Sequence, residues 1–129
     1  MPKPGAWHHL EDRLIGLAYA VCLLTDRLPR TALASHIAGQ LLRSGTSAAP
    51  NYAEAQSAES RNDFIHRMNI CLKELRETHV WLELCRRLEL VDAGELERAV
   101  GETNELIAIF MASIKTARKN GAKRVTKTQ

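Results

Sequence analysis

Apolar residues recur along the chain in steps of three and four, the spacing that places side chains on one face of an α-helix. The first such stretch consists of Leu10, Leu14, Leu17, Val21, Leu24 and Leu28. Ile15, Ala18 and Cys22 lie beside this line and are expected to widen the apolar face. Because a proline disfavours helix at the residue before it, Pro29 predicts that this amphipathic helix ends near Leu28.

Capping residues mark the next two helices. Thr31 is a favourable N-cap for a helix that carries Leu33, Ile37, Leu41 and Leu42. Ser60 can cap a third helix, and Asp63 completes a capping-box arrangement there. The third helix has the clearest periodicity and is expected to reach about Glu89, with one face formed by Phe64, Met68, Cys71, Leu75, Thr78, Leu82 and Cys85.

A fourth helix is expected after the break at "VDAGE", with Asp92 as its cap. Its apolar face consists of Leu96, Val100, Thr103, Ile107, Phe110 and Ile114, and Ala117 closes the pattern. Four helices with short connections predict an all-α fold, an antiparallel up-down four-helix bundle, over residues 1–119. After Asn120-Gly121 the composition turns polar and basic, so residues 120–129 are expected to form a flexible tail.

The stretch from Arg43 to Phe64 is rich in small residues and contains Pro50. If the second helix continues through it, its small side chains form a face that a neighbouring backbone can approach closely. Pro50 removes a hydrogen-bond donor and crowds the carbonyl of Thr46, so a kink near Thr46 to Ala49 is expected. The alternative is a helix break at Ser44-Gly45 and a loop to Ser60. Structureless loops of about 15 residues are uncommon in small domains, so we favour a kinked second helix.

Charge is distributed unevenly along the chain. The 129 residues carry a net charge of +3, but six basic residues and no acidic residue lie from position 115 onward: Lys115, Arg118, Lys119, Lys123, Arg124 and Lys127. The preceding 12 basic and 15 acidic residues give −3. Such a basic end predicts weak, salt-sensitive and sequence-independent binding to RNA or DNA, and a solubilising tail is the alternative.

Other features limit the classes of function. No apolar run reaches the roughly 18 residues of a membrane span, and no signal segment is visible, so a cytoplasmic location is expected. The three cysteines have no metal-ligand spacing and are expected to be buried thiols on apolar faces. The histidines have no paired nucleophile, and no phosphate-binding glycine loop occurs.

Polar residues are concentrated in the central third of the sequence, as Arg43, Asn51, Glu54, Glu74, Arg76 and Glu77. Carboxylate pairs across a bundle are typical of di-iron sites, but these also need Glu-x-x-His motifs, which the chain lacks. No metal, cofactor or catalytic set is therefore indicated. Arginine–carboxylate pairs that fix helix register or a subunit interface are the favoured interpretation. Trp81, beside this set, is either the flank of a wide core or an anchor for a partner subunit.

The segment from Gln40 to Leu84 contains an ordered series of motifs. It has Q-x-x-R-S, then S-x-x-x-N-x-x-E at Ser47, Asn51 and Glu54, then S-x-x-D-F, and finally K-E-x-R-E-T-x-x-W-L from Lys73 to Leu82. In these motifs the chain resembles the four-helix-bundle protein family, also called the 23S rRNA intervening-sequence protein family. The resemblance implies a ring-like homo-oligomer, a pentamer in known relatives, without a known reaction. Nucleic-acid association is suspected for that family.

The sequence therefore favours a non-enzymatic helical bundle that acts as a scaffold or an RNA-associated factor through its basic tail, and the resemblance implies that this bundle is a homo-oligomer, a pentamer as in known relatives. The alternative is a protein–protein interaction module without a nucleic-acid role, whose ring presents the surface from Arg43 to Glu54. Neither a membrane nor a small-molecule substrate is indicated.

Overall fold

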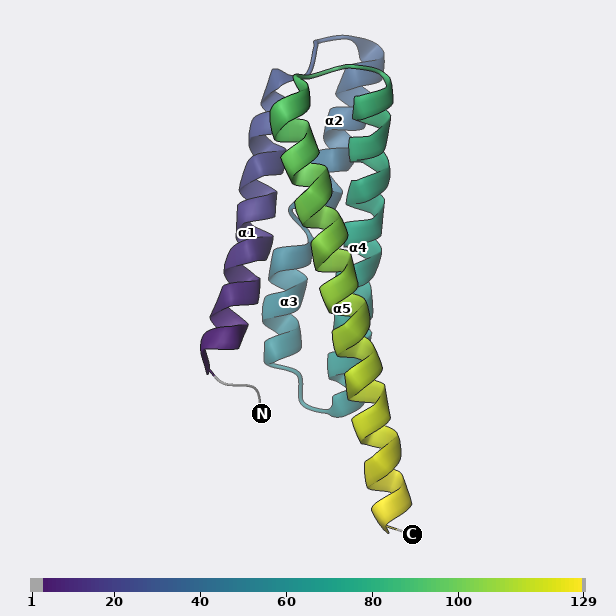
Figure 1. Cartoon of the computed structure of the whole chain (residues 1–129). Coiled ribbons are helices and arrows are strands. Elements are labelled where there is room, and N and C mark those ends of the chain that lie inside the picture. The colour runs from purple at the N-terminus through teal and green to yellow at the C-terminus, as the bar shows by residue number, and fades with distance from the viewer. Residues whose placement is uncertain (1–3, 129) are drawn as a thin grey trace.

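The computed structural model describes the backbone of residues 4–128 and the side chains of residues 9–121. It contains five helices: α1 (Pro4–Arg27), α2 (Ala32–Gly45), α3 (Ala48–Gln56), α4 (Arg61–Arg87) and α5 (Ala93–Thr128), and no strand occurs within 4–128. Both α2 and α3 pack between α1 and α4, and α5 closes the bundle between α4 and α1. The predicted up-down four-helix bundle is thus confirmed, with α2 and α3 together forming its second member (Figure 1).

The second member of the bundle is interrupted at Thr46 and Ser47, where the kink was predicted. The Thr46 hydroxyl donates to the carbonyl oxygen of Leu42 at 2.7 Å, which satisfies an acceptor at the end of α2. Pro50 lies in the first turn of α3, where a missing N–H costs little because that donor has no intrahelical partner. The alternative of a loop from Ser44 to Ser60 is wrong, because α3 occupies most of that stretch.

The small residues before this kink allow α2 to approach α1 closely. A Cβ atom added to Gly45 would lie 2.7 Å from Cγ1 of Val21, closer than packed carbon atoms come. On the neighbouring side, the buried hydroxyls of Ser44 and Thr78 lie 3.1 Å apart and join α2 to α4. Small side chains in this segment therefore allow α2 to pack closely against both α1 and α4.

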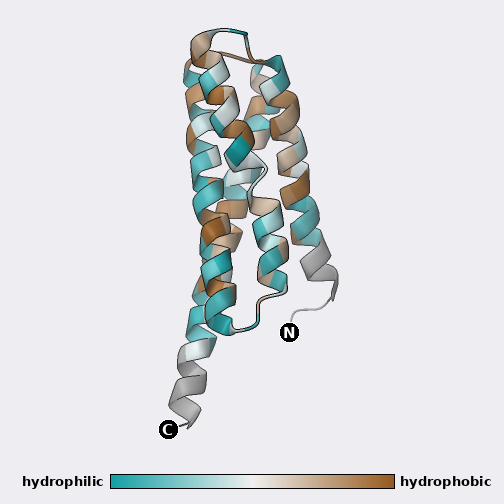
Figure 2. Ribbon diagram, turned by 180° about the vertical axis from the view of Figure 1, so that it is seen from behind, coloured by the Kyte–Doolittle hydropathy of each residue, from teal (hydrophilic) through white to brown (hydrophobic). Residues whose placement is uncertain are grey.

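The core follows the predicted stripes of α1, α4 and α5. On α4, Met68, Cys71, Leu75, Thr78, Leu82 and Cys85 are all buried, and Phe64 is partly buried. Figure 2 shows hydrophobic and hydrophilic residues alternating along the helices, as expected when each helix buries one face. The predicted stripes of α1, α4 and α5 are thus confirmed, whereas on α2 Ile37 and Leu41 are buried but Leu33 and Leu42 are exposed.

Two predictions on α1 are wrong. Ile15 and Cys22, expected to widen its apolar face, are exposed. The covered stripe of α1 is narrow because α1 packs against α2 and α3 on one side and α5 on the other, which leaves its outer face without a neighbour. Cys71 and Cys85 are buried, as predicted.

Two of the three predicted N-caps, Thr31 and Ser60, are confirmed, and the capping role of Asp92 stays a prediction. The Thr31 hydroxyl oxygen accepts the N–H of Ala34 at 3.1 Å, and that of Ser60 accepts the N–H of Asp63 at 3.1 Å. At the end of α4 the chain turns through Glu89, which has a positive φ of 53°. The N–H of Leu90 donates to the carbonyl oxygen of Cys85 at 3.1 Å, the hydrogen bond of a Schellman motif.

The last helix, α5, continues through Asn120 and Gly121 to Thr128, past the point where the sequence predicted its end. Figure 1 shows this end projecting beyond the other helices. The flexibility expected of 120–129 stays a prediction, and the side chains of Lys123, Arg124 and Lys127 lie outside the described residues. Among the described helices, none is both long and apolar enough to cross a bilayer.

Candidate functional site

The structure brings together four of the polar residues singled out in the sequence. Arg43, on α2, reaches across to α4, where its Nη1 lies 3.2 Å from Glu74 Oε2 and its Nη2 binds Glu77. The Trp81 indole N–H donates to Glu77 Oε1 at 3.4 Å. The ring of His36 packs edge-on against Trp81 with centroids 5.9 Å apart. These contacts fix α2 against α4 and hold Trp81 at the bundle surface.

The electrostatics of this cluster favour its ionised form. The hydrogen bond from Arg43 holds the pKa of Glu77 below its ordinary value, and the same bond raises the pKa of Arg43. The guanidinium is half-exposed, so water also screens the pair. Because both carboxylates already pair with Arg43, the cluster has the character of a structural clamp rather than of an acid–base site.

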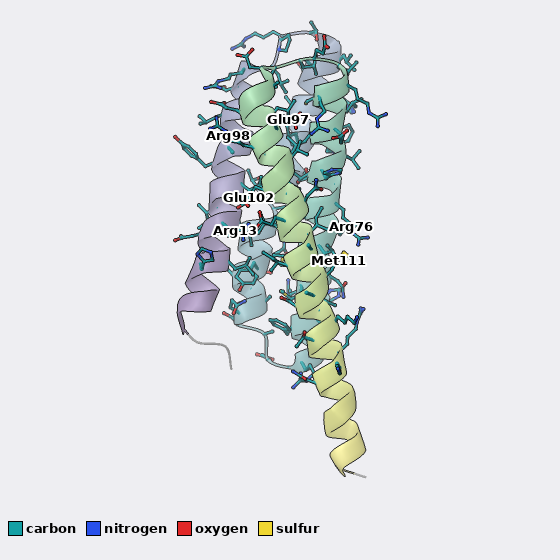
Figure 3. The ribbon with its side chains drawn as sticks, viewed as in Figure 1. Arg13, Arg76, Glu97, Arg98, Glu102 and Met111 are labelled. Atoms are coloured by element: carbon teal, nitrogen blue, oxygen red, sulfur yellow. The ribbon has the colours of Figure 1, made fainter. Side chains whose placement is uncertain are left out.

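The other polar residues lie elsewhere. Asn51 donates to the carbonyl oxygen of Ser47 at 2.9 Å, within its own helix. Glu54, on α3, pairs with Arg67 of α4, whose Nη1 lies 2.6 Å from its Oε2. The guanidinium of Arg76 points toward α5, 3.4 Å from Met111 Sδ (Figure 3). The set thus contributes to three helix contacts and does not form one site.

No group of three or more histidine, cysteine, aspartate or glutamate side chains within the described residues could hold a metal ion. The buried thiols are also poor ligands, because burial raises the pKa of Cys71 to about 12 and raises the pKa of Cys85. The arrangement of these side chains gives no support to a metal centre.

The N-terminal part of α1 and the C-terminal part of α5 diverge at one end of the bundle (Figure 1). A cavity that was not predicted from the sequence opens between the helices at this end. Its volume is about 850 Å³, and its wall is formed by α1, α3, α4, α5 and the connection between α3 and α4. Small residues such as Ala58, Ala112 and Ser113 line it, where larger side chains would fill the space. No local pattern in the sequence indicates this space, because its wall is assembled from five separate segments of the chain.

An ion pair joins α1 to α5 beside this cavity. Arg13 binds Glu102 through two nitrogens, with Nη2–Oε1 2.5 Å and Nε–Oε2 3.0 Å, and its Nη2 is also 3.3 Å from Glu105 Oε1 (Figure 3). The hydrogen bond to Glu102 raises the pKa of Arg13. The bidentate geometry fixes the spacing of the two helices at the point from which they diverge.

The comparisons with known proteins agree with this fold. The sequence profile described as "23S rRNA-intervening sequence protein" matches residues 12–112.

The chain belongs to the 23S rRNA-intervening sequence protein family.

A solved structure from Bacteroides thetaiotaomicron, described as a protein of unknown function from the S23 ribosomal protein family, is similar to it. The two share 35% sequence identity over 82% of this chain and 98% of the other, with a TM-score of 0.76. No curated protein matches the chain.

In this member of the 23S rRNA-intervening sequence protein family, the structure describes the side chains of three of the six predicted nucleic-acid-binding residues. Lys115, Arg118 and Lys119 lie on α5 and are exposed. None of the three forms an ion pair with another described residue. They lie near the projecting end of the helix and are therefore free to contact a polyanion.

An exposed apolar stripe runs along the outer face of α1. Ile15, Tyr19 and Leu23 are 52%, 67% and 40% exposed, and their spacing of four residues places them on one side of the helix. A shallow groove between α1 and α5, with a volume of about 360 Å³, lies beside Tyr19 and Leu23. This stripe was not predicted from the sequence, where Ile15 was expected to widen the covered face of the helix.

Proposed function

We propose that the protein is a non-enzymatic scaffold that assembles into a homo-oligomer and binds RNA through the basic end of α5. The observation that carries the proposal is the exposed charge of Lys115, Arg118 and Lys119, which form no ion pair with another described residue, on a helix that projects from the bundle. The family's description names 23S rRNA, which supports an association with RNA.

The charge distribution supports electrostatic binding without recognition of particular bases. From Lys115 onward the chain has six basic residues and no acidic residue. Lysine and arginine side chains that neutralise phosphates release counterions, so affinity falls as the salt concentration rises. No aromatic residue occurs after Phe110, and base stacking therefore adds nothing at this end of the chain.

Assembly would strengthen such weak binding. The stripe of Ile15, Tyr19 and Leu23 supports an interface on α1, because contiguous apolar surface of this kind is typical of subunit contacts. Five subunits, as the family resemblance implies, would place five basic ends on one particle. Several weak contacts to the same RNA then raise the overall affinity without any new interaction.

The test is RNA binding across a salt series, with the full chain and a variant carrying Lys115→Gln, Arg118→Gln and Lys119→Gln. We expect the variant to bind single-stranded RNA more weakly and with a smaller dependence on salt. The logarithmic slope should fall by about 0.7 for each phosphate that the variant no longer neutralises. A matched control carries Arg30→Gln, Arg87→Gln and Arg98→Gln, which remove the same charge from exposed positions near the opposite end of the bundle.

Equal weakening in the control and the α5 variant would show that net charge alone governs binding, against a role for α5. Absence of binding at low salt would contradict the RNA proposal altogether. The alternative function, a protein-interaction module that presents the surface from Arg43 to Glu54, would then be preferred. The structure gives that surface less support, since Arg43, Asn51 and Glu54 are all occupied by contacts within the chain.

A further inference from the structure

The cavity at the end of the bundle has the size of a small-molecule site and takes no part in the proposed function. Its volume of about 850 Å³ lies within the range of roughly 300–1,000 Å³ that ligand pockets occupy. Its wall draws residues from α1, α3, α4 and α5. A molecule bound there would contact every member of the bundle.

The inner wall of the cavity is apolar and well fixed. Leu10, Tyr52, Phe64, Met68 and Ile109 contribute to it. The Tyr52 ring packs edge-on against Phe110 with centroids 5.7 Å apart, and burial raises its pKa to about 12. The phenol therefore stays neutral, and an apolar ligand group placed against this wall would be removed from water.

The polar groups at the mouth of the cavity favour an anion. Arg61 lines the cavity, and its Nη1 donates to the carbonyl oxygen of Ala117 at 3.2 Å, but it has no carboxylate partner among residues 9–121. Arg61 is also the first residue of α4, whose N-terminal end carries a partial positive charge. Arg13 is neutralised by Glu102, and Glu59, the one acidic residue in the described wall, is exposed. An anionic group supplies hydrogen-bond acceptors only, which matches the guanidinium of Arg61 in the cavity wall.

We propose that this cavity binds a small amphipathic carboxylate. The hydrocarbon part lies against Tyr52, Phe64 and Met68, and the carboxylate binds the guanidinium of Arg61 at the mouth. A medium-chain fatty acid is the simplest molecule of this class. This inference does not depend on RNA binding, since Lys115, Arg118 and Lys119, the described basic residues assigned to RNA, do not line the cavity.

The test follows the methionine methyl groups of the full-length protein by NMR during titration with decanoate, below the concentration at which it forms micelles. The methyl of Met68, in the cavity wall, should shift saturably, whereas that of Met111, exposed beside Arg76, should not. Affinity should rise about fourfold for each methylene added from octanoate to dodecanoate, as burial of each group removes apolar surface from water.

Variants separate the two parts of the site. Arg61→Gln keeps a donor for Ala117 and should weaken decanoate binding tenfold or more while leaving 1-decanol binding unchanged. Arg67→Gln is the matched control on the same helix, because that guanidinium pairs with Glu54 outside the cavity and the substitution should change neither affinity. Ala112→Phe places bulk in the cavity wall at an exposed position and should weaken both ligands.

Three results would overturn the proposal. The first is a Met68 shift that does not saturate, or no shift at all. The second is an equal shift at Met111, which would indicate non-specific adsorption. The third is decanoate affinity that Arg61→Gln leaves unchanged, which would show that the carboxylate is not recognised.

Discussion

At the scale of single residues, Gly45 shows how one missing side chain sets the distance between two helices. Its φ is not positive, so alanine fits the local backbone, and the three atoms nearest to an added Cβ all belong to the Val21 side chain, the closest at 2.7 Å. Gly45→Ala should therefore lower the free energy of unfolding by about 1–3 kcal/mol through overpacking. The midpoint and slope of urea denaturation measure this change.

Gly39 is the matched control for that substitution. It lies inside α2 with nothing within 4 Å of an added Cβ, so Gly39→Ala should stabilise the protein by about 0.5–1 kcal/mol. In a Val21→Ala background, Gly45→Ala should cost less than in the natural sequence. An equal cost in both backgrounds would show that the Val21 contact is not the cause.

The three cysteines differ in environment, and their reactivity follows from it. Cys71 and Cys85 are buried, with raised pKa values, so at neutral pH both are protonated and inaccessible. No more than one thiol, that of Cys22, should react with a disulfide reagent in the folded protein, and all three should react after denaturation. Rapid native reaction in a Cys22→Ser variant would contradict this assignment.

At the scale of helices, the end of α4 stores backbone strain. Glu89 is exposed and adopts a positive φ of 53°, a conformation that costs a residue with a Cβ about 1–2 kcal/mol. Glycine relieves this strain but loses more conformational entropy on folding. Glu89→Gly should therefore give a net stabilisation of about 0.5–1 kcal/mol. Glu89→Ala keeps the Cβ and should give none. Thermal unfolding curves in which the two variants coincide would refute this account of the turn.

Local chemistry made most of the helix boundaries predictable from the sequence. Thr31 and Ser60 cap helices because their hydroxyls satisfy free backbone N–H groups, which requires no knowledge of the rest of the fold. The kink at Thr46 was also predictable from local chemistry, because Pro50 lacks a backbone donor and crowds the carbonyl of Thr46. The end of α5 was predicted wrongly because Asn120-Gly121 is a strong stop signal for a helix. In the structure Arg61, from a distant part of the chain, packs across Gly121 and donates a hydrogen bond to the carbonyl oxygen of Ala117.

The candidate sites were less predictable, since they depend on how helices are placed in space. Periodicity assigned Ile15 to the core, but whether a flanking position is covered depends on the neighbouring helix. Arg43, Glu74 and Glu77 were grouped correctly, whereas Arg76 points to another helix because a single residue step turns the side chain by about 100°. The cavity results from divergence of α1 and α5, which no local pattern encodes.

At the scale of the whole molecule, the basic end of α5 and the apolar stripe of α1 lie on different parts of the surface. The stripe is central in α1, whereas the basic residues lie toward the projecting end of α5. Assembly and RNA binding should therefore be separable by substitution. Tyr19→Ser, at the most exposed residue of the stripe, should weaken assembly, and the triple α5 variant should leave it intact.

Native mass spectrometry of the protein with and without a short single-stranded RNA tests both parts of this account in one measurement. We predict an assembly of five chains of 14.4 kDa that gains the mass of RNA, a smaller species for Tyr19→Ser, and an intact assembly without RNA for the triple α5 variant. A single chain at micromolar concentration that binds no RNA at low salt would contradict the proposed function.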